Sequence, residues 1–210
     1  MYPFILLQKL CADRDIPLPP LNTSDEAVAT LAVQNELPTQ EVKTNVGILR
    51  IRPAEGKEEL LEVEKLMRDS AEEGRDFAVD EFNDNGFFAA RLLRTADRVV
   101  AENASGEIIG AAVLGPSAYT RSPVSLLAQQ YMAIKKKEHY QAVGNALLQY
   151  GMPLFKNQGY KGVLSDVYLT SHRMTDVYRS NFFTFRGSVP YAGAIKGDGP
   201  VPTNIVYYPF

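Results

Sequence analysis

The sequence has only one cysteine, Cys11, among its 210 residues, so no disulfide can form within the chain. A lone cysteine is typical of proteins from a reducing compartment, which favours a cytoplasmic location. No apolar run approaches the roughly 20 residues that a membrane-spanning helix needs. The opening stretch MYPFILLQKLC contains a short apolar segment, but it lacks the basic start and the small-residue cleavage site of a signal peptide. We therefore expect no membrane partner and no secretion signal.

Histidine is scarce as well, and several motifs that identify enzymes are missing. The chain has two histidines, His139 and His172, and no CxxC or HExxH pair, so we expect no zinc or other metal site. It has neither the G-x-S-x-G elbow of many hydrolases nor a Walker A loop. The net charge of −3 provides no attraction toward nucleic acid or an anionic membrane. These absences leave chemistry that needs neither a metal nor a serine triad.

The composition is that of a globular protein, with 45% hydrophobic and 22% charged residues. The first part of the chain differs from the rest. The stretch IPLPP predicts a stiff, extended linker, and a capping box follows it at the start of a helix over 24–36. We therefore expect an N-terminal extension over 1–46, which is a candidate site for a protein partner, and a regular domain over 47–210.

In the domain, alternating and helical apolar patterns follow one another. Strands are expected at 48–53, 98–103, 108–115, 126–134, 162–169, 184–191 and 204–210. Helices are expected at 57–74 and 87–95, from the turn after residue 134 to Gly159, and at 171–183. Pro153 should kink or split the third of these helices, and the stretch AGAIKGDGP at 192–200 reads as a loop. The order predicts a mixed α/β (α+β) fold, with a mostly antiparallel central sheet flanked by helices and one βαβ crossover.

A lysine-rich turn, KKKEHYQAVGNALLQYG at 135–151, joins a predicted strand to a predicted helix. The first turn of a helix leaves backbone N–H groups unpaired, and its aligned peptide dipoles favour a negative charge there. Small residues at such a turn let phosphate oxygens approach the chain closely. The turn is therefore a candidate anion-binding loop, and the alternative is a plain strand–loop–helix turn with a solvated lysine run.

In its element order and in two local motifs, the region 47–210 resembles the GNAT superfamily of acyl-CoA-dependent N-acetyltransferases. The first motif is the strand-to-helix junction at Tyr131–Leu148, and the second is the later helix that ends in VYRSNFF. The resemblance implies a GNAT-like fold, in which the junction holds the pyrophosphate of the co-substrate acetyl-CoA.

The family pattern at this junction is Gln or Arg, two residues, Gly, one residue, then Gly or Ala, and two registers fit it. Read literally, Gln141, Gly144 and Ala146 match. Counted from the preceding strand, the pattern begins at His139 and has Ala142 and Gly144 in the glycine places. We prefer the second register because it keeps the usual distance between strand and loop. It departs from the family at His139 and Ala142, although an alanine in a helical turn still presents its N–H group.

The resemblance implies that acetyl-CoA contacts the end of the strand, the turn and the start of the later helix. The residues implied are Met132, Ile134, His139, Tyr140, Gln141, Ala142, Val143, Gly144, Asn145 and Ser171.

The resemblance also implies direct attack of an amine on the thioester, with a tyrosine that protonates the leaving thiolate. Tyr178 matches that tyrosine, and the alternative is a tyrosine that only packs on an apolar helix face. The glutamate that serves many members as general base corresponds to Ala128, and the adjacent Gln129 and Gln130 cannot replace it.

Two further positions depart from the family. Ser171 stands where an asparagine is common, and the glycine expected before the closing phenylalanine is Phe182, or Asn181 if the turn is one residue shorter. The sequence therefore supports two hypotheses. The first is an N-acetyltransferase, monomeric or homodimeric, that acts on an amine of a small molecule or protein. The second is a catalytically inactive GNAT-like module whose N-terminal extension binds a protein partner.

Overall fold

The computed structural model describes residues 37–77, 97–117, 127–195 and 199–210. The chain divides into two compact units, Met1–Leu37 and Pro38–Phe210, and the second contains all the elements given below. The helices predicted over 24–36 and 87–95 lie outside the described residues. The role predicted for residues 1–46 as an extension stays a prediction.

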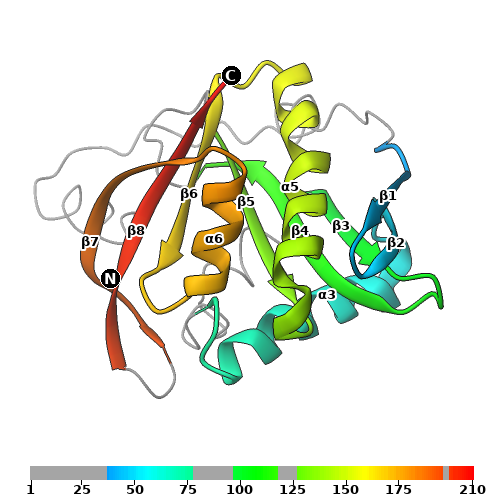
Figure 1. The fold of residues 1–210 in the computed structure, drawn as a ribbon, viewed down its shortest axis with the longest axis horizontal. Coiled ribbons are helices and arrows are strands. Elements are labelled where there is room, and N and C mark those ends of the chain that lie inside the picture. The colour runs from blue at the N-terminus through cyan, green and yellow to red at the C-terminus, as the bar shows by residue number, and fades with distance from the viewer. Residues whose placement is uncertain (1–36, 78–96, 118–126, 196–198) are drawn as a thin grey trace, which may run out of the picture. The chain divides into compact units, whose positions relative to one another are not determined.

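The second unit is built on one mixed sheet of eight strands, in the order β1-β2-β3-β4-β5-β6-β8-β7 (Figure 1). The strands are β1 (Gln40–Thr44), β2 (Gly47–Pro53), β3 (Asp97–Glu102), β4 (Ile108–Pro116), β5 (Leu127–Ile134), β6 (Gly162–Tyr168), β7 (Thr184–Ile195) and β8 (Gly199–Pro209). The helices are α3 (Gly56–Glu72), α5 (Tyr140–Asn157) and α6 (His172–Ser180), and the short 3₁₀ helix η3 (Lys137–His139) precedes α5. Only β5 and β6 pair in parallel, through the β5–α5–β6 crossover, and the other neighbours are antiparallel. The predicted fold class is therefore confirmed.

Helices cover both faces of the sheet, with α5 and α6 on one face and α3 on the other (Figure 1). Strand β4 lies between the two layers and is buried along almost its whole length. Its residues Ala111 and Val113 pack in the cluster under α3. Gly110, on the opposite face, lies so close to Val143 of α5 that a Cβ atom at this position would overlap the valine side chain. This alternation explains why β4 reads as one continuous apolar run.

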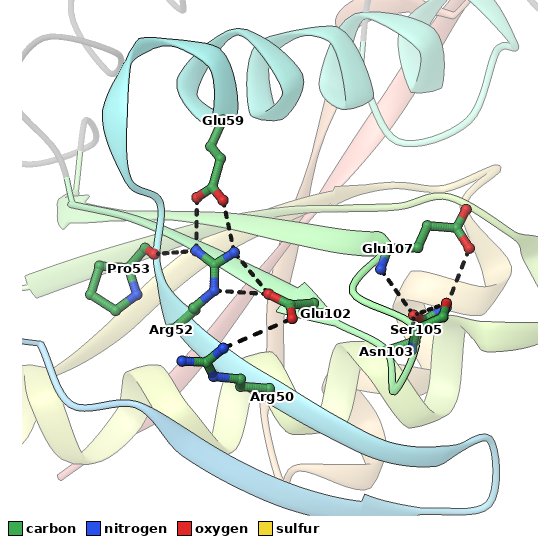
Figure 2. Close-up of polar contacts among 8 residues, drawn as sticks. All are labelled: Arg50, Arg52, Pro53, Glu59, Glu102, Asn103, Ser105 and Glu107. Atoms are coloured by element: carbon green, nitrogen blue, oxygen red, sulfur yellow. Dashed lines mark hydrogen bonds and ion pairs between the residues drawn. The ribbon is translucent and has the colours of Figure 1, made fainter.

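Several local predictions hold. Helix α3 ends before Gly74, which has φ +67°, and the β3–β4 turn uses Gly106 with φ +83°. In that turn, the Asn103 side-chain oxygen accepts from the backbone N–H groups of Ser105 and Glu107 (Figure 2). These side-chain bonds reinforce the backbone bonds of the turn, from Asn103 N–H to the Glu107 carbonyl and from Gly106 N–H to the Asn103 carbonyl.

Two local predictions are corrected in part. Pro153 does not split its helix, because α5 runs without interruption from Tyr140 to Asn157, and a kink there stays a prediction. The stretch 192–200 is predicted as a loop, but its described residues, 192–195 and 199–200, belong to the β7–β8 ladder, with Gly193 opposite Val201 and Ile195 opposite Gly199. Backbone pairing with a neighbouring strand outweighs the weak local preference of a glycine-rich sequence.

An ion-pair cluster ties β2 to α3 and β3 (Figure 2). The guanidinium of Arg52 makes two bonds of 2.7 Å to the two carboxylate oxygens of Glu59, in the first turn of α3. Its Nε donates to Glu102 of β3 at 2.9 Å. The Arg52 side chain is 11% exposed, so these bonds lie in a partly dry environment that strengthens them. The cluster fixes the start of α3 against the sheet.

Helix α6 ends in a Schellman motif whose left-handed residue is not glycine. The N–H of Phe183 bonds the carbonyl oxygen of Tyr178 at 3.1 Å, and the N–H of Phe182 bonds that of Arg179 at 3.0 Å. Phe182 has φ 64°, and its residue surface is 82% exposed. The sequence left open whether Phe182 or Asn181 stands in place of the family's glycine, and the positive φ angle identifies Phe182. Its Cβ costs conformational energy that glycine would avoid.

We expect Arg52→Met to lower the free energy of unfolding by about 2–3 kcal/mol, because it leaves Glu59 and Glu102 partly buried without their cation. Arg50→Met is the matched control on the same strand. The Arg50 side chain is 51% exposed and lies 3.9 Å from Glu102, so we expect a loss of no more than about 0.5 kcal/mol. Urea unfolding measures both, and equal losses would contradict the assignment.

The contribution of Arg52 to the free energy of unfolding should decrease at low pH. The hydrogen bonds from Arg52 lower the pKa of Glu59 below its usual 4.5, although partial burial opposes the shift. A carboxylate with a lowered pKa stabilises the fold above its unfolded-state pKa, and this contribution is lost as the pH falls through the folded-state value. The stability gap between wild type and Arg52→Met should therefore be full at pH 7 and narrow below pH 4.5.

Phe182→Gly should raise the free energy of unfolding by about 1 kcal/mol, because glycine adopts the left-handed conformation without strain. For a chain of this size, that gain corresponds to a rise in Tm of about 2–4 °C. Phe182→Ala removes the same exposed ring but keeps a Cβ, so it serves as the control and should bring no gain. Calorimetry of the two variants checks the assignment, which fails if alanine stabilises as much as glycine.

Candidate functional site

The central feature of the sheet is a gap between its two parallel strands. Strands β5 and β6 pair only at Leu127 with Gly162 and at Ala128 with Val163, and then diverge. Strand β5 continues to Ile134 beside β4, and β6 continues to Tyr168 beside β8. The wide end of the gap lies where α5 and α6 begin, on the lower side in Figure 1. Backbone groups of β5 that face this gap need partners from elsewhere.

Side chains supply partners for two of these backbone groups. The carbonyl oxygen of Gln130 accepts from Ser165 Oγ at 3.1 Å and from Tyr178 Oη at 3.2 Å. The carbonyl oxygen of Ile134 accepts from Nη1 of Arg75 at 2.6 Å. Met132 lies two residues from both Gln130 and Ile134 along β5. Its backbone groups therefore point to the same side of the strand and also face the gap.

Tyr178 places its hydroxyl in the gap, as the sequence prediction requires. The Oη atom lies 3.0 Å from Ser165 Oγ, and the ring packs edge-on against Phe183 with centroids 5.0 Å apart. Burial raises the pKa of Tyr178 well above its usual value, and the carboxylates of Asp166 and Asp76 raise it further, while the bond with Ser165 opposes them. The hydroxyl is therefore protonated at neutral pH and holds its proton more tightly than a free tyrosine does.

Asp166 is a functional candidate that the sequence analysis missed. It lies on β6 beside the gap, and its Oδ1 accepts from Nε2 of Gln129 on β5 at 2.9 Å. Side chains alternate along β6, so Asp166 projects from the opposite face to its neighbour Ser165. The signal in the sequence was a charged residue within the otherwise apolar strand pattern GVLSDVYL.

The start of α5 has the form of an anion site. The helix has His139 at its N-cap, no side chain caps it, and no acid lies in its first turn. The first N–H groups of α5, those of Tyr140, Gln141 and Ala142, have no acceptor within α5 itself, and the 3₁₀ helix η3 directly precedes them. The adjacent Lys135, Lys136 and Lys137 are all exposed, and Lys135 pairs with Glu107 at 2.7 Å. Within the described residues, Nδ1 of His139 is a buried nitrogen without a hydrogen-bond partner.

Other residues predicted to contact the cofactor are engaged in packing. A Cβ atom at Gly144 would lie 2.8 Å and 2.9 Å from the two γ-carbons of Val177, so this glycine allows α5 and α6 to approach closely. Gln141 and Asn145 bond each other at 3.0 Å, and Asn145 accepts from Asn181 at 2.7 Å. Their side chains therefore join α5 to the end of α6 and do not project freely from the turn.

Three further predicted residues contact the segment after α3. The hydroxyl of Tyr140 donates to the carboxylate of Asp76, and Ser171 Oγ donates to the carbonyl oxygen of Arg75 at 2.7 Å. Ile134 accepts from the Arg75 guanidinium, as described above. Arg75, which is buried, and Asp76, which is half-buried, are thus part of the candidate site.

Gly144→Ala tests whether this glycine serves packing. We expect the substitution to destabilise the wild type, because overpacking a tight contact costs about 1–3 kcal/mol. In a Val177→Ala background the same substitution should be neutral or stabilising, since alanine forms helix better than glycine by about 1 kcal/mol. A double-mutant cycle from urea unfolding gives the coupling, and additive effects would contradict the packing role.

No protein-family model matches the sequence, and no curated protein matches it. Within the described ranges, no helix is both long and apolar enough to cross a membrane.

Solved structures do match. One is a GCN5-related N-acetyltransferase from Kribbella flavida, with a TM-score of 0.64 and 22% identity over 77% of this chain and 98% of its own. Another is a GNAT superfamily phosphinothricin acetyltransferase from Sinorhizobium meliloti in complex with acetyl-CoA, with a TM-score of 0.59 and 16% identity over 76% of this chain and 87% of its own. A third is an acetyltransferase of the GNAT family from Streptococcus pneumoniae, with a TM-score of 0.60 and 18% identity over 77% of this chain and 99% of its own. The described domain therefore has the fold of the GNAT N-acetyltransferases.

Proposed function

We propose that the protein transfers the acetyl group of acetyl-CoA to an amine. The observation that carries the proposal is the gap between β5 and β6, with the protonated hydroxyl of Tyr178 inside it. The gap holds backbone polar groups that the sheet itself does not pair, together with a positioned acid. Structures of the same fold include one solved in complex with acetyl-CoA.

The residues around the gap fit such a co-substrate. The backbone of Met132 and Ile134 offers donors and acceptors to an amide-containing chain, and the first turn of α5 offers N–H groups to phosphates. The buried Nδ1 of His139, at the N-cap of that turn, is a polar atom that a ligand could pair. When bound, acetyl-CoA supplies a thioester whose carbonyl carbon an amine can attack.

The chain supplies an acid and a base on opposite faces of the sheet. Tyr178 reaches the gap from α6 and holds a proton at Oη for the leaving sulfur. Asp166 projects toward the other face and is held by Gln129, so its carboxylate is oriented to accept the proton of the attacking amine. This assignment gives the role of general base to a residue of β6, in place of the family position now occupied by Ala128.

The acceptor is an amine of a small molecule or protein. One of the similar structures is a phosphinothricin acetyltransferase. The lone cysteine favours a reducing compartment, and we place the reaction in the cytoplasm.

Calorimetric titration of the purified full chain with acetyl-CoA, and with CoA in parallel, tests the proposal. We expect saturable binding with a micromolar Kd. Tyr178→Phe should bind acetyl-CoA with unchanged affinity and lose about 10²-fold in the rate of thiol release with a panel of amines, because it removes only the acid.

Tyr160→Phe is the matched control, because Tyr160 packs edge-on against Phe155 and is not among the residues that line the gap. It should leave both binding and rate unchanged. If the folded protein does not bind acetyl-CoA, and the variants described in the next subsection do not bind it either, the proposed enzyme activity is refuted. That result would favour the inactive GNAT-like module.

A further inference from the structure

The segment after α3 lies across the gap between β5 and β6. Its residues Arg75, Asp76 and Phe77 form what we call the strap. Phe77 is 3% exposed and packs in the core cluster under α3. The backbone N–H of Arg75 bonds the carbonyl oxygen of Ser70 at 2.9 Å. The strap is thus anchored to α3 at one end and to the core at the other.

The strap takes up three of the groups implied in acetyl-CoA binding. Arg75 occupies the carbonyl oxygen of Ile134 at 2.6 Å and lies 3.3 Å from the hydroxyl of Tyr140. Asp76 accepts from that same hydroxyl, and the Arg75 carbonyl accepts from Ser171 at 2.7 Å. These bonds replace the partners that a ligand in the gap would supply.

The strap also fills the space. Asp76 and Phe77 line the gap with Tyr178, Met132 and Asp166, and the cavity left between them is about 20 Å³. A cavity of this size holds roughly one water molecule. An acetyl thioester does not fit beside Tyr178 while the strap is in place.

We propose that the strap is a built-in competitor of acetyl-CoA, which must leave the gap before the co-substrate binds. The inference rests on the proposed function and adds a regulation of that same site. If the competent state is a fraction of the population, the apparent Kd is the intrinsic Kd divided by that fraction. Weakening the strap should therefore tighten binding.

The bonding of the strap is suited to release. Asp76 as a residue is partly exposed, but its carboxyl group is enclosed. Burial raises the pKa of that carboxyl, while the bond from Tyr140 and the charge of Arg75 oppose the shift. Removing Asp76 and Arg75 from water offsets much of what their bonds contribute. A ligand that satisfies Ile134, Tyr140 and Ser171 can therefore displace the strap at modest cost.

Two variants weaken the strap in different ways. Arg75→Gln removes the cation that bonds Ile134, and Ser70→Ala removes a buried hydroxyl that lies 3.2 Å from Asp76 Oδ2 and 3.4 Å from its backbone nitrogen. Arg68→Gln is the matched control, because Arg68 pairs with Glu64 on the exposed face of α3. Circular dichroism checks that each variant folds.

Affinity and hydrogen exchange are measured together on the full chain, with acetyl-CoA as the probe. We expect Arg75→Gln and Ser70→Ala to bind acetyl-CoA about tenfold more tightly than wild type, and Arg68→Gln to bind as wild type does. In the wild type, acetyl-CoA should speed amide exchange at Arg75 and Asp76, whereas ordinary ligand binding slows exchange.

The outcomes separate the strap from the proposed function. If wild type binds acetyl-CoA and neither variant binds more tightly, the proposal that the strap competes with acetyl-CoA is overturned. Slower exchange at the strap would overturn it as well. In both cases the proposed acetyltransferase function is unaffected. Weaker binding by Arg75→Gln alone would make Arg75 a ligand of the co-substrate and would also overturn the strap. If exchange shows that the variants have opened, yet none of the proteins binds acetyl-CoA, both proposals fail.

Discussion

The divergence of β5 and β6 is the constraint on which the rest of the site depends. A parallel pair that stops after two residue pairs leaves backbone carbonyl groups of β5 facing the interior of the domain. Such groups are costly to bury without a partner. The domain meets this requirement with side chains from three separate elements: Ser165 of β6, Tyr178 of α6 and Arg75 after α3. The gap is therefore the place where the sheet loses backbone pairing and where polar side chains collect.

The same constraint explains why the candidate acid is well positioned. Tyr178 is held at its hydroxyl by Gln130 and Ser165 and at its ring by Phe183. A tyrosine that only packed would not need its hydroxyl in the gap. In the proposed reaction, the structural and catalytic roles of Tyr178 would coincide, because the bond that satisfies the strand also fixes the position of the hydroxyl.

Helix α5 shows how a motif can be shared between packing and binding. Two glycines of α5 bring the helix close to its neighbours: Gly144 accommodates Val177 of α6, and Gly151 accommodates the side chain of Gln130 of β5. Close approach places the first turn of α5 at the wide end of the gap. In this way small residues help to position the first turn of α5, which contains Tyr140, Gln141 and Ala142. The sequence pattern at 139–146 therefore serves helix packing and also forms the candidate anion-binding turn. Only the tertiary structure shows which of its residues pack against neighbours.

From β2 onward, the sequence by itself determined the order of the described elements, the mixed sheet with one crossover, the strand-to-helix junction and the position of Tyr178 on its helix, because these follow from local periodicity and turn residues. Only the tertiary structure decided that Gln40–Thr44 form the edge strand β1, that 192–195 and 199–200 extend a ladder, that α5 continues through Pro153, and that Phe182 adopts the left-handed conformation. It also brought Arg75, Asp76 and Asp166 to the gap. Their roles come from contacts between residues far apart in the chain, such as the bond from Arg75 to Ile134, and no local pattern encodes such a contact.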